Sequence, residues 1–194
     1  NNWYDLATRT ATMQKYNLQI TAGTDKTQFL LAGSYLDNEG VVRTTFNRNA
    51  TFRLNLDHQA TNRLKIGGRV AGGYNHGTDF RTGELFSLPW RWVTFTRPWI
   101  PHKDPEGNYP PIRRVGPFTG PADNPIANLE QENRYATQYS LLANAFAEYE
   151  IVKSLKVKYL GGIEYFMNRL YDLDPIYDRG DYANTIVNVV DNFG

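Results

Sequence analysis

The chain of 194 residues has no cysteine, no long apolar run and no excess of one charge. The absence of Cys excludes disulfides and thiolate metal sites. No stretch reaches the roughly 18 apolar residues that a transmembrane helix needs. With 21 Lys and Arg against 20 Asp and Glu, the net charge of +1 gives no basic surface for nucleic acid. These absences leave a chain of nearly zero net charge that has no disulfide and no transmembrane helix.

Motifs for catalysis and cofactor binding are also missing. The chain has no phosphate-cradling Gly loop and no nucleophile elbow, and its three histidines lack metal-ligand spacing. We therefore expect no enzyme, no catalytic residue, no metal and no cofactor. The three histidines are His58, His76 and His102.

Two acidic groups permit an alternative interpretation. Glu148 and Glu150 share one strand face, as a glycosidase pair can, but no opposing strand partner is identifiable. A lumen-facing acidic patch is the interpretation that we prefer. Four aspartates crowd the expected last loop and could ligate Ca²⁺, although EF-hand spacing is absent and a solvated loop is the default. They are Asp172, Asp174, Asp178 and Asp181.

Aromatic residues are abundant, at 14% of the chain, and they lie in segments that alternate apolar with polar residues. An alternation of period two predicts β-strands that have one apolar face. Six segments show it: 16–22, 28–36, 50–58, 64–75, 139–151 and 155–168. None of them contains Pro, which cannot donate a hydrogen bond within a sheet.

The connections between these segments alternate in length. Tight turns are expected at 23–27, 60–63 and 152–154, whereas the other links are long: 37–49, 76–138 and the residues after Arg169. Short turns on one side and long loops on the other are typical of an outer-membrane barrel. The pattern therefore predicts an antiparallel transmembrane barrel segment.

The loop 76–138 holds nine of the ten prolines and three of the four tryptophans. A connection this long is uncommon unless it is functional or disordered, and its aromatic content argues against disorder. We interpret it as an ordered loop whose Trp and Arg side chains contact a ligand or a covering protein, or pack the loop itself. The candidates are Trp90, Trp92, Trp99, Arg97, Arg113 and Arg114, with Arg91 beside them.

Aromatic rings mark both ends of one strand face. Tyr139 and Tyr149 lie ten residues apart, which corresponds to about 26 Å along the axis of a tilted strand. This matches the apolar band of about 25 Å between the aromatic girdles of a membrane barrel. We predict a lipid-facing girdle of Phe29, Tyr35, Tyr74, Tyr139, Tyr149 and Tyr165.

The opposite face of the second segment, from Leu30 to Leu36, is not strongly polar. A plug or loops inside a large barrel would cover such residues. Two other interpretations stay open: a secreted carbohydrate-binding β-sandwich that uses the Trp-rich loop, and a scaffold barrel that transports nothing. The sandwich would require its apolar faces to meet across one core.

Five stretches resemble the barrel of the SusC-like (RagA-like) TonB-dependent transporters of Bacteroidetes outer membranes. They are "NNWYDLATRTATMQKYNLQITAGTDKTQFLLAGSYLDNEGVV", "FRLNLDHQATNRLKIGGRV", "RPWIPHKDPEGNYPP", "NPIANLE" and "LLANAFAEYEIVKSLKVKYLGGIEY". They occur in order along nearly the whole chain.

The resemblance implies an all-β fold and about six strands of a larger, 22-stranded barrel, with residues 1–194 all in the barrel domain. It also implies a location in the outer membrane of a Gram-negative bacterium, a SusD-like surface lipoprotein that closes as a lid, and pairing as dimers. The cargo would be oligosaccharides or oligopeptides, and a TonB complex would act through a plug domain that this chain lacks. Six strands cannot close such a barrel, so we expect the chain to be a fragment, either part of a longer protein or a piece held by other chains.

Overall fold

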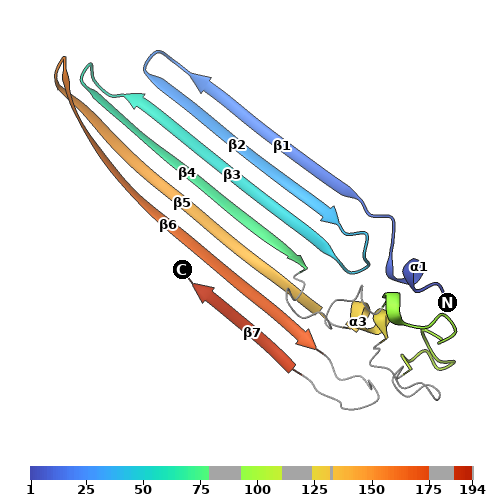
Figure 1. The fold of residues 1–194 in the computed structure, drawn as a ribbon. Coiled ribbons are helices and arrows are strands. Elements are labelled where there is room, and N and C mark those ends of the chain that lie inside the picture. Colours follow the sequence, from blue (N-terminus) through green and yellow to red (C-terminus); the bar gives the residue numbers. More distant parts are fainter. Residues whose placement is uncertain (79–92, 111–123, 132, 175–185, 194) are drawn as a thin grey trace.

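The computed structural model describes residues 1–78, 93–110, 124–131, 133–174 and 186–193. These residues form one antiparallel sheet of seven strands, in which each strand pairs with the next along the chain (Figure 1). The elements are α1 (Trp3–Ala7), β1 (Met13–Gly23), β2 (Thr27–Glu39), β3 (Phe46–Gln59), β4 (Leu64–Thr78), α3 (Pro125–Gln131), β5 (Asn133–Val152), β6 (Leu155–Asp174) and β7 (Ile186–Phe193). Within the described residues, no helix is both long and apolar enough to cross a membrane.

The all-β antiparallel fold is as predicted, and each of the six predicted segments lies inside one of the strands β1 to β6. A seventh strand, β7, follows the six that were predicted. The strands are also longer than expected, so that the long connection runs from 79 to 132 and the link after β2 from 40 to 45. The polar residues Asp37, Asn38 and Glu39, which fall in the expected link 37–49, pair with β3 instead.

The tight turns gather at one end of the sheet, away from α1 and α3 (Figure 1). Threonine side chains close two of them by accepting backbone hydrogen bonds. Thr24 Oγ1 accepts from the amide of Thr27 at 3.2 Å, and Thr61 Oγ1 accepts from the amide of Leu64 at 3.0 Å. Such Thr-centred bonds favour turns over a continued strand. The strand ends that flank the three long connections lie at the other end of the sheet.

The strand register fixes the residues that share a face. One row across β1 to β6 consists of Leu18, Gly33, Phe52, Gly72, Leu141 and Tyr165. The next row belongs to the opposite face and consists of Gln19, Ala32, Arg53, Ala71, Leu142 and Glu164. We call the first the apolar face and the second the polar face. The sheet is therefore amphipathic as a whole, because the alternation is in phase in six strands.

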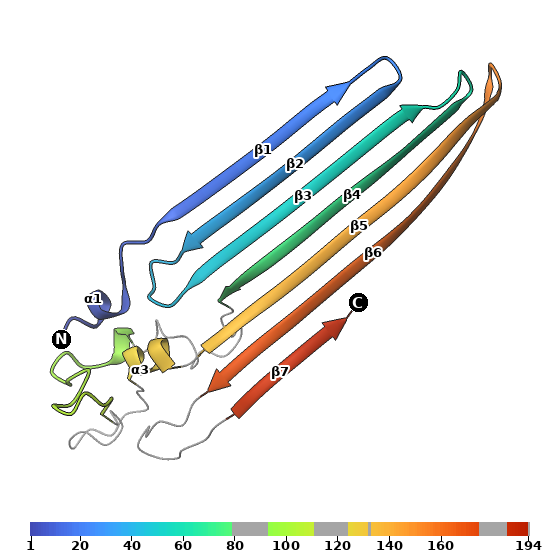
Figure 2. The ribbon, with the colours of Figure 1, turned by 180° about the vertical axis from the view of Figure 1, so that it is seen from behind.

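The compact core lies outside the sheet, at the end that holds the long connections. Helix α1, residues 93–109 and α3 pack together there to form a cap (Figure 2). The hydrophobic core of the cap consists of Trp3, Ala7, Val93, Ile100, Ile126 and Leu129. Trp3 Nε1 also donates to the carbonyl of Arg97 at 2.9 Å. The cap therefore joins the first residues of the chain to the long connection.

Candidate functional site

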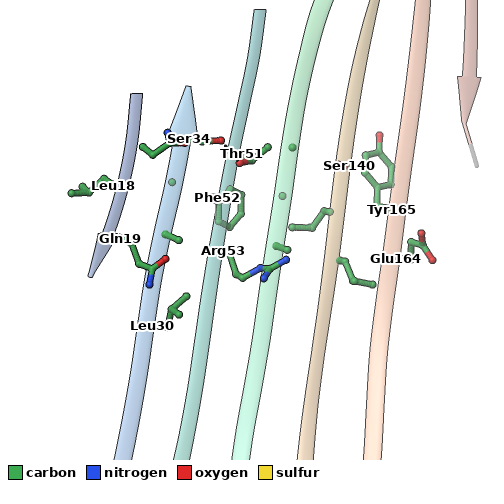
Figure 3. A pocket seen from close by; sticks show the side chains of 18 of the residues that line it. Leu18, Gln19, Leu30, Ser34, Thr51, Phe52, Arg53, Ser140, Glu164 and Tyr165 are labelled. Atoms are coloured by element: carbon green, nitrogen blue, oxygen red, sulfur yellow. Dashed lines mark hydrogen bonds between the residues drawn. The ribbon is translucent and has the colours of Figure 1, made fainter. Parts of the chain in front are cut away.

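The polar face carries a shallow hollow of about 630 Å³ over β1 to β6. Figure 3 shows the side chains that line it. Hydroxyl groups gather in one row, where Ser34 and Thr51 are hydrogen-bonded at 2.6 Å and Ser140 follows two strands along. Small residues such as Ala71 and Gly73 form part of the floor, so a ligand could approach the backbone closely.

Charged groups of opposite sign border this hollow. Arg53 comes from β3 and Glu164 from β6, three strands apart in the sheet (Figure 3). Leu30 and Leu142 add apolar surface between polar groups. A surface with hydroxyls, amides, both charges and some apolar area can bind a polar oligomer without any covalent step.

The acidic pair on β5 is bound by a lysine. Lys156 Nζ lies 3.3 Å from Glu148 Oε1 and 3.9 Å from Glu150 Oε2. A cation between the two carboxylates makes this an ion-pair network on the polar face. It favours the acidic-patch interpretation over a glycosidase pair.

The expected aspartate-rich last loop was partly wrong, because β6 extends to Asp174. Asp172 is 8% exposed and its carboxylate accepts from Arg134 Nη1 on the neighbouring strand at 3.0 Å. Asp178 and Asp181 lie outside the described residues. No group of three potential metal ligands occurs in the part of the chain that the structure describes.

The six predicted girdle residues all lie on the apolar face. Tyr35, Tyr74 and Tyr139 fall in one row with Ala50, and the rings of Tyr74 and Tyr139 are 5.2 Å apart. Tyr149 and Phe29 lie nearer the tight turns. Tyr165 pairs with Leu141, two residues from the Tyr139 row in the direction of the tight turns. Between the Tyr139 row and the Tyr149 row, the described apolar face carries no charged residue.

Sequence reasoning missed the extension of the tyrosine row beyond Tyr74. The rings of Phe46 and His76 are 5.2 Å apart, those of His76 and Tyr135 5.1 Å, and those of Tyr135 and Tyr171 4.6 Å. All four residues lie in stretches that we expected to be loops. Their period-two spacing from Tyr74 and Tyr139 was the signal that could have found them.

Two of the six predicted ligand-contacting residues lie in the described part of the cap. Trp99 is 74% exposed, and the guanidinium of Arg97 lies 5.5 Å from the centre of its ring. Trp90, Trp92, Arg113 and Arg114 lie outside the described residues. Trp99 thus presents an open aromatic surface at the end of the sheet that holds the long connections.

The remainder of the cap is held by polar contacts. Asn124 Oδ1 accepts from the amides of Ile126 and Ala127 at 3.1 and 3.3 Å, which caps α3. The hydroxyl of Tyr109 donates to Glu130. Burial, and then the hydrogen bond and charge of Glu130, raise the pKa of Tyr109 above its ordinary value. These hydrogen bonds stabilise the cap, which carries Trp99 on its surface.

Comparison with known sequences points to one group of proteins. No protein-family model matches the chain. TonB-dependent receptor P26 of Formosa agariphila is 26% identical over 149 residues, which are 77% of this chain and 14% of the receptor. TonB-dependent receptor P3 of the same organism is 25% identical over 168 residues, 81% of this chain and 16% of the receptor. The chain therefore spans about one seventh of the length of these curated relatives.

Solved structures share the fold. The RagAB peptide importer in its open-open state matches 94% of this chain and 20% of its own, with a TM-score of 0.70 and 20% identity. The RagAB peptide transporter matches 90% of this chain and 20% of its own, with a TM-score of 0.67 and 19% identity. These names are of receptors, transporters and importers, and none is of an enzyme.

The same comparisons support the predicted location in the outer membrane of a Gram-negative bacterium. They cover most of this chain and a small part of each relative. Sequence similarity and the shared fold together confirm the expected resemblance: the chain is similar to one barrel segment of the SusC-like, RagA-like TonB-dependent transporters.

Proposed function

We propose that this chain forms part of the barrel wall of an outer-membrane TonB-dependent importer of oligosaccharides or oligopeptides. The observation that carries the proposal is the two-faced sheet. One face is free of charge between its aromatic rows, while the other holds Arg53, Arg69, Glu148 and Glu164. A wall between hydrocarbon and a polar lumen requires this division.

In this proposal the polar face binds cargo without covalent chemistry, and the cap lies on the extracellular side. Trp99 and Arg97 contact either the cargo or a SusD-like lipoprotein that closes over the barrel. Energy is supplied from outside this chain by a TonB complex that acts on a plug domain. The importers work as dimers, as the resemblance implies.

The two alternative functions make different demands on the apolar face. A β-sandwich needs a second sheet packed on it, whereas the described residues form one sheet. Ile163 and Leu18 are 66% and 65% exposed there, which favours contact with lipid. A scaffold barrel would share this face and differ only in failing to move cargo.

Uptake by cells that carry the full-length protein tests the proposal. Deletion of its gene should abolish TonB-dependent accumulation of labelled oligosaccharides or oligopeptides and leave uptake of monomers intact. The protein should fractionate with the outer membrane and require detergent for extraction. A full-length protein that is soluble without detergent would contradict the importer and favour the sandwich, and a membrane protein without any cargo uptake would favour the scaffold.

A further inference from the structure

A second group of charges lies on the polar face, nearer the tight turns than the hollow. Phe146 is only 7% exposed although it stands among polar residues. Its ring lies over Gly67, its cross-strand partner, where an added Cβ would come within 2.5 Å of Phe146 Cε1. The missing side chain of Gly67 thus allows the ring to approach the backbone of the sheet closely.

Three cations surround this ring. Lys158 Nζ lies 4.7 Å from the ring centre, Arg69 Cζ 5.8 Å and Lys65 Nζ 6.0 Å. We call Phe146 with these three residues the Phe146 cluster. Rings attract cations within about 6 Å, which explains why three positive groups converge here. The ring does not remove their charge, so mutual repulsion remains.

The three cations differ in how they are compensated. Lys65 Nζ lies 3.2 Å from Asp57 Oδ2. Arg69 and Lys158 are exposed, and no carboxylate pairs with either of them among the described residues. Arg69 stands between the neutral Asn55 and Asn144 in the register.

Glu148 does not neutralise Lys158, although it stands opposite it in the register. Its carboxylate is bound to Lys156 at 3.3 Å. The ammonium of Lys158 lies over the Phe146 ring. Because Glu148 is paired with Lys156, this ammonium can still bind an anion. Two exposed cations held near one buried ring form a site that favours a bridging carboxylate over any neutral group.

We infer that the Phe146 cluster binds a carboxylate group of acidic cargo, with Arg69 and Lys158 as the ligand-contacting residues. This inference rests on the proposed function, because it assigns the chemical class of the cargo that meets the polar face. The Phe146 ring holds the two cations in place, and Asn55 and Asn144 leave the space beside Arg69 free of negative charge. Neutral oligomers gain nothing from this site.

Direct binding to the purified full-length protein in detergent tests the inference without energised transport. Two pairs of probes differ only in their carboxylates: a glycine–glutamate hexapeptide with its glycine–glutamine counterpart, and a galacturonate hexamer with a galactose hexamer. We expect the acidic member of at least one pair to bind more tightly. The double variant Arg69→Gln, Lys158→Gln should weaken that binding by about tenfold. Raising the salt concentration should have the same effect on the unaltered protein.

Lys15→Gln is the matched control, because Lys15 lies on the polar face of β1, outside the cluster. It should leave the preference unchanged. Equal affinity for acidic and neutral probes in both pairs would overturn the inference, as would a preference that survives in the double variant. A double variant that melts at a lower temperature and keeps its preference would also overturn it, since the cluster would then hold another part of the polypeptide. Absence of cellular uptake would count against the proposed importer alone, because binding in detergent does not depend on it.

Discussion

At the scale of residues, close pairs of phenylalanine and glycine stand out. Phe146 covers Gly67 on the polar face, and Phe52 covers Gly72 on the apolar face. In both pairs the two residues are directly opposite in the register. A ring that lies over a cross-strand glycine shields the exposed backbone of that glycine and adds contact area. These glycines are therefore required by the neighbouring ring.

Gly67→Ala should lower the free energy of unfolding of the full-length barrel by about 1 to 3 kcal/mol. The added Cβ would come within 2.5 Å of Phe146 Cε1 and within 2.7 Å of the carbonyl oxygen of Leu56. Because one contact is with backbone, a side-chain rotation alone cannot relieve it. The urea midpoint in detergent measures the effect.

Gly161→Ala is the control for this prediction. Its added Cβ would meet only Tyr159, at an ordinary 3.7 Å. We expect its urea midpoint to stay close to that of the unaltered protein. If both variants were equally stable, Phe146 would have to move away from Gly67 at no cost, and the close packing described here would be wrong.

The alternation of the sequence predicted the face on which each of these residues lies. It could not predict the pairs, because a contact between Phe146 and Gly67 depends on the register of β4 against β5. The register follows from turns and long connections, which carry no periodic signal. The same limit applied to the cations around Phe146, which come from two strands beside its own.

At the scale of elements, the strands are longer than their alternation indicated. β5 and β6 each have 20 residues, about twice the 9 to 11 needed to cross a membrane. Most of the additional residues lie beyond the row of Tyr139, where Arg134 and Asp172 form an ion pair. Aliphatic residues give way there to the rings of Tyr135 and Tyr171, although pairing between the strands continues. The aliphatic alternation therefore predicted the central part of each strand, and the period-two spacing of the rings was the signal for the extension.

The cap is the element that sequence reasoning could identify only in part. An ordered loop was expected, but its packing against α1 joins residues more than 90 positions apart, as between Trp3 and Arg97. Trp3→Ala should destabilise the cap by about 3 to 5 kcal/mol, because Trp3 is 3% exposed in its core. Limited proteolysis of the full-length protein should then cut within residues 93–109 faster than before.

Trp99→Ala is the matched change, since the same large ring is removed from an exposed position. We expect no gain in protease sensitivity. If Trp99 contacts the lipoprotein or the cargo, this variant should weaken that association by about tenfold in a pull-down or binding titration. Unaltered association with both would remove Trp99 from the proposed contact surface.

At the scale of the whole molecule, the sheet has one apolar face with no second layer of described residues upon it. The polar face, the hollow and the Phe146 cluster all lie on the other side. If hydrocarbon covers the apolar face, the sheet is one wall of a barrel, with its apolar face in lipid and its polar face in the lumen. If protein covers it, the proposed lumen, the proposed cargo site and the proposed importer are all ruled out.

Neighbouring residues on β5 provide the most direct measurement. Ala143 lies on the apolar face and Leu142 on the polar face. Spin labels at Ala143→Cys and Leu142→Cys, in the full-length protein in bilayers, report their surroundings by collision with oxygen or with a water-soluble nickel complex. We predict that the label at 143 is relaxed by oxygen, as in lipid, and the label at 142 by nickel, as in a wet lumen. A label at 143 that neither reagent reaches, with the label at 142 in bulk water, would place residue 143 in a closed protein core and contradict the barrel wall.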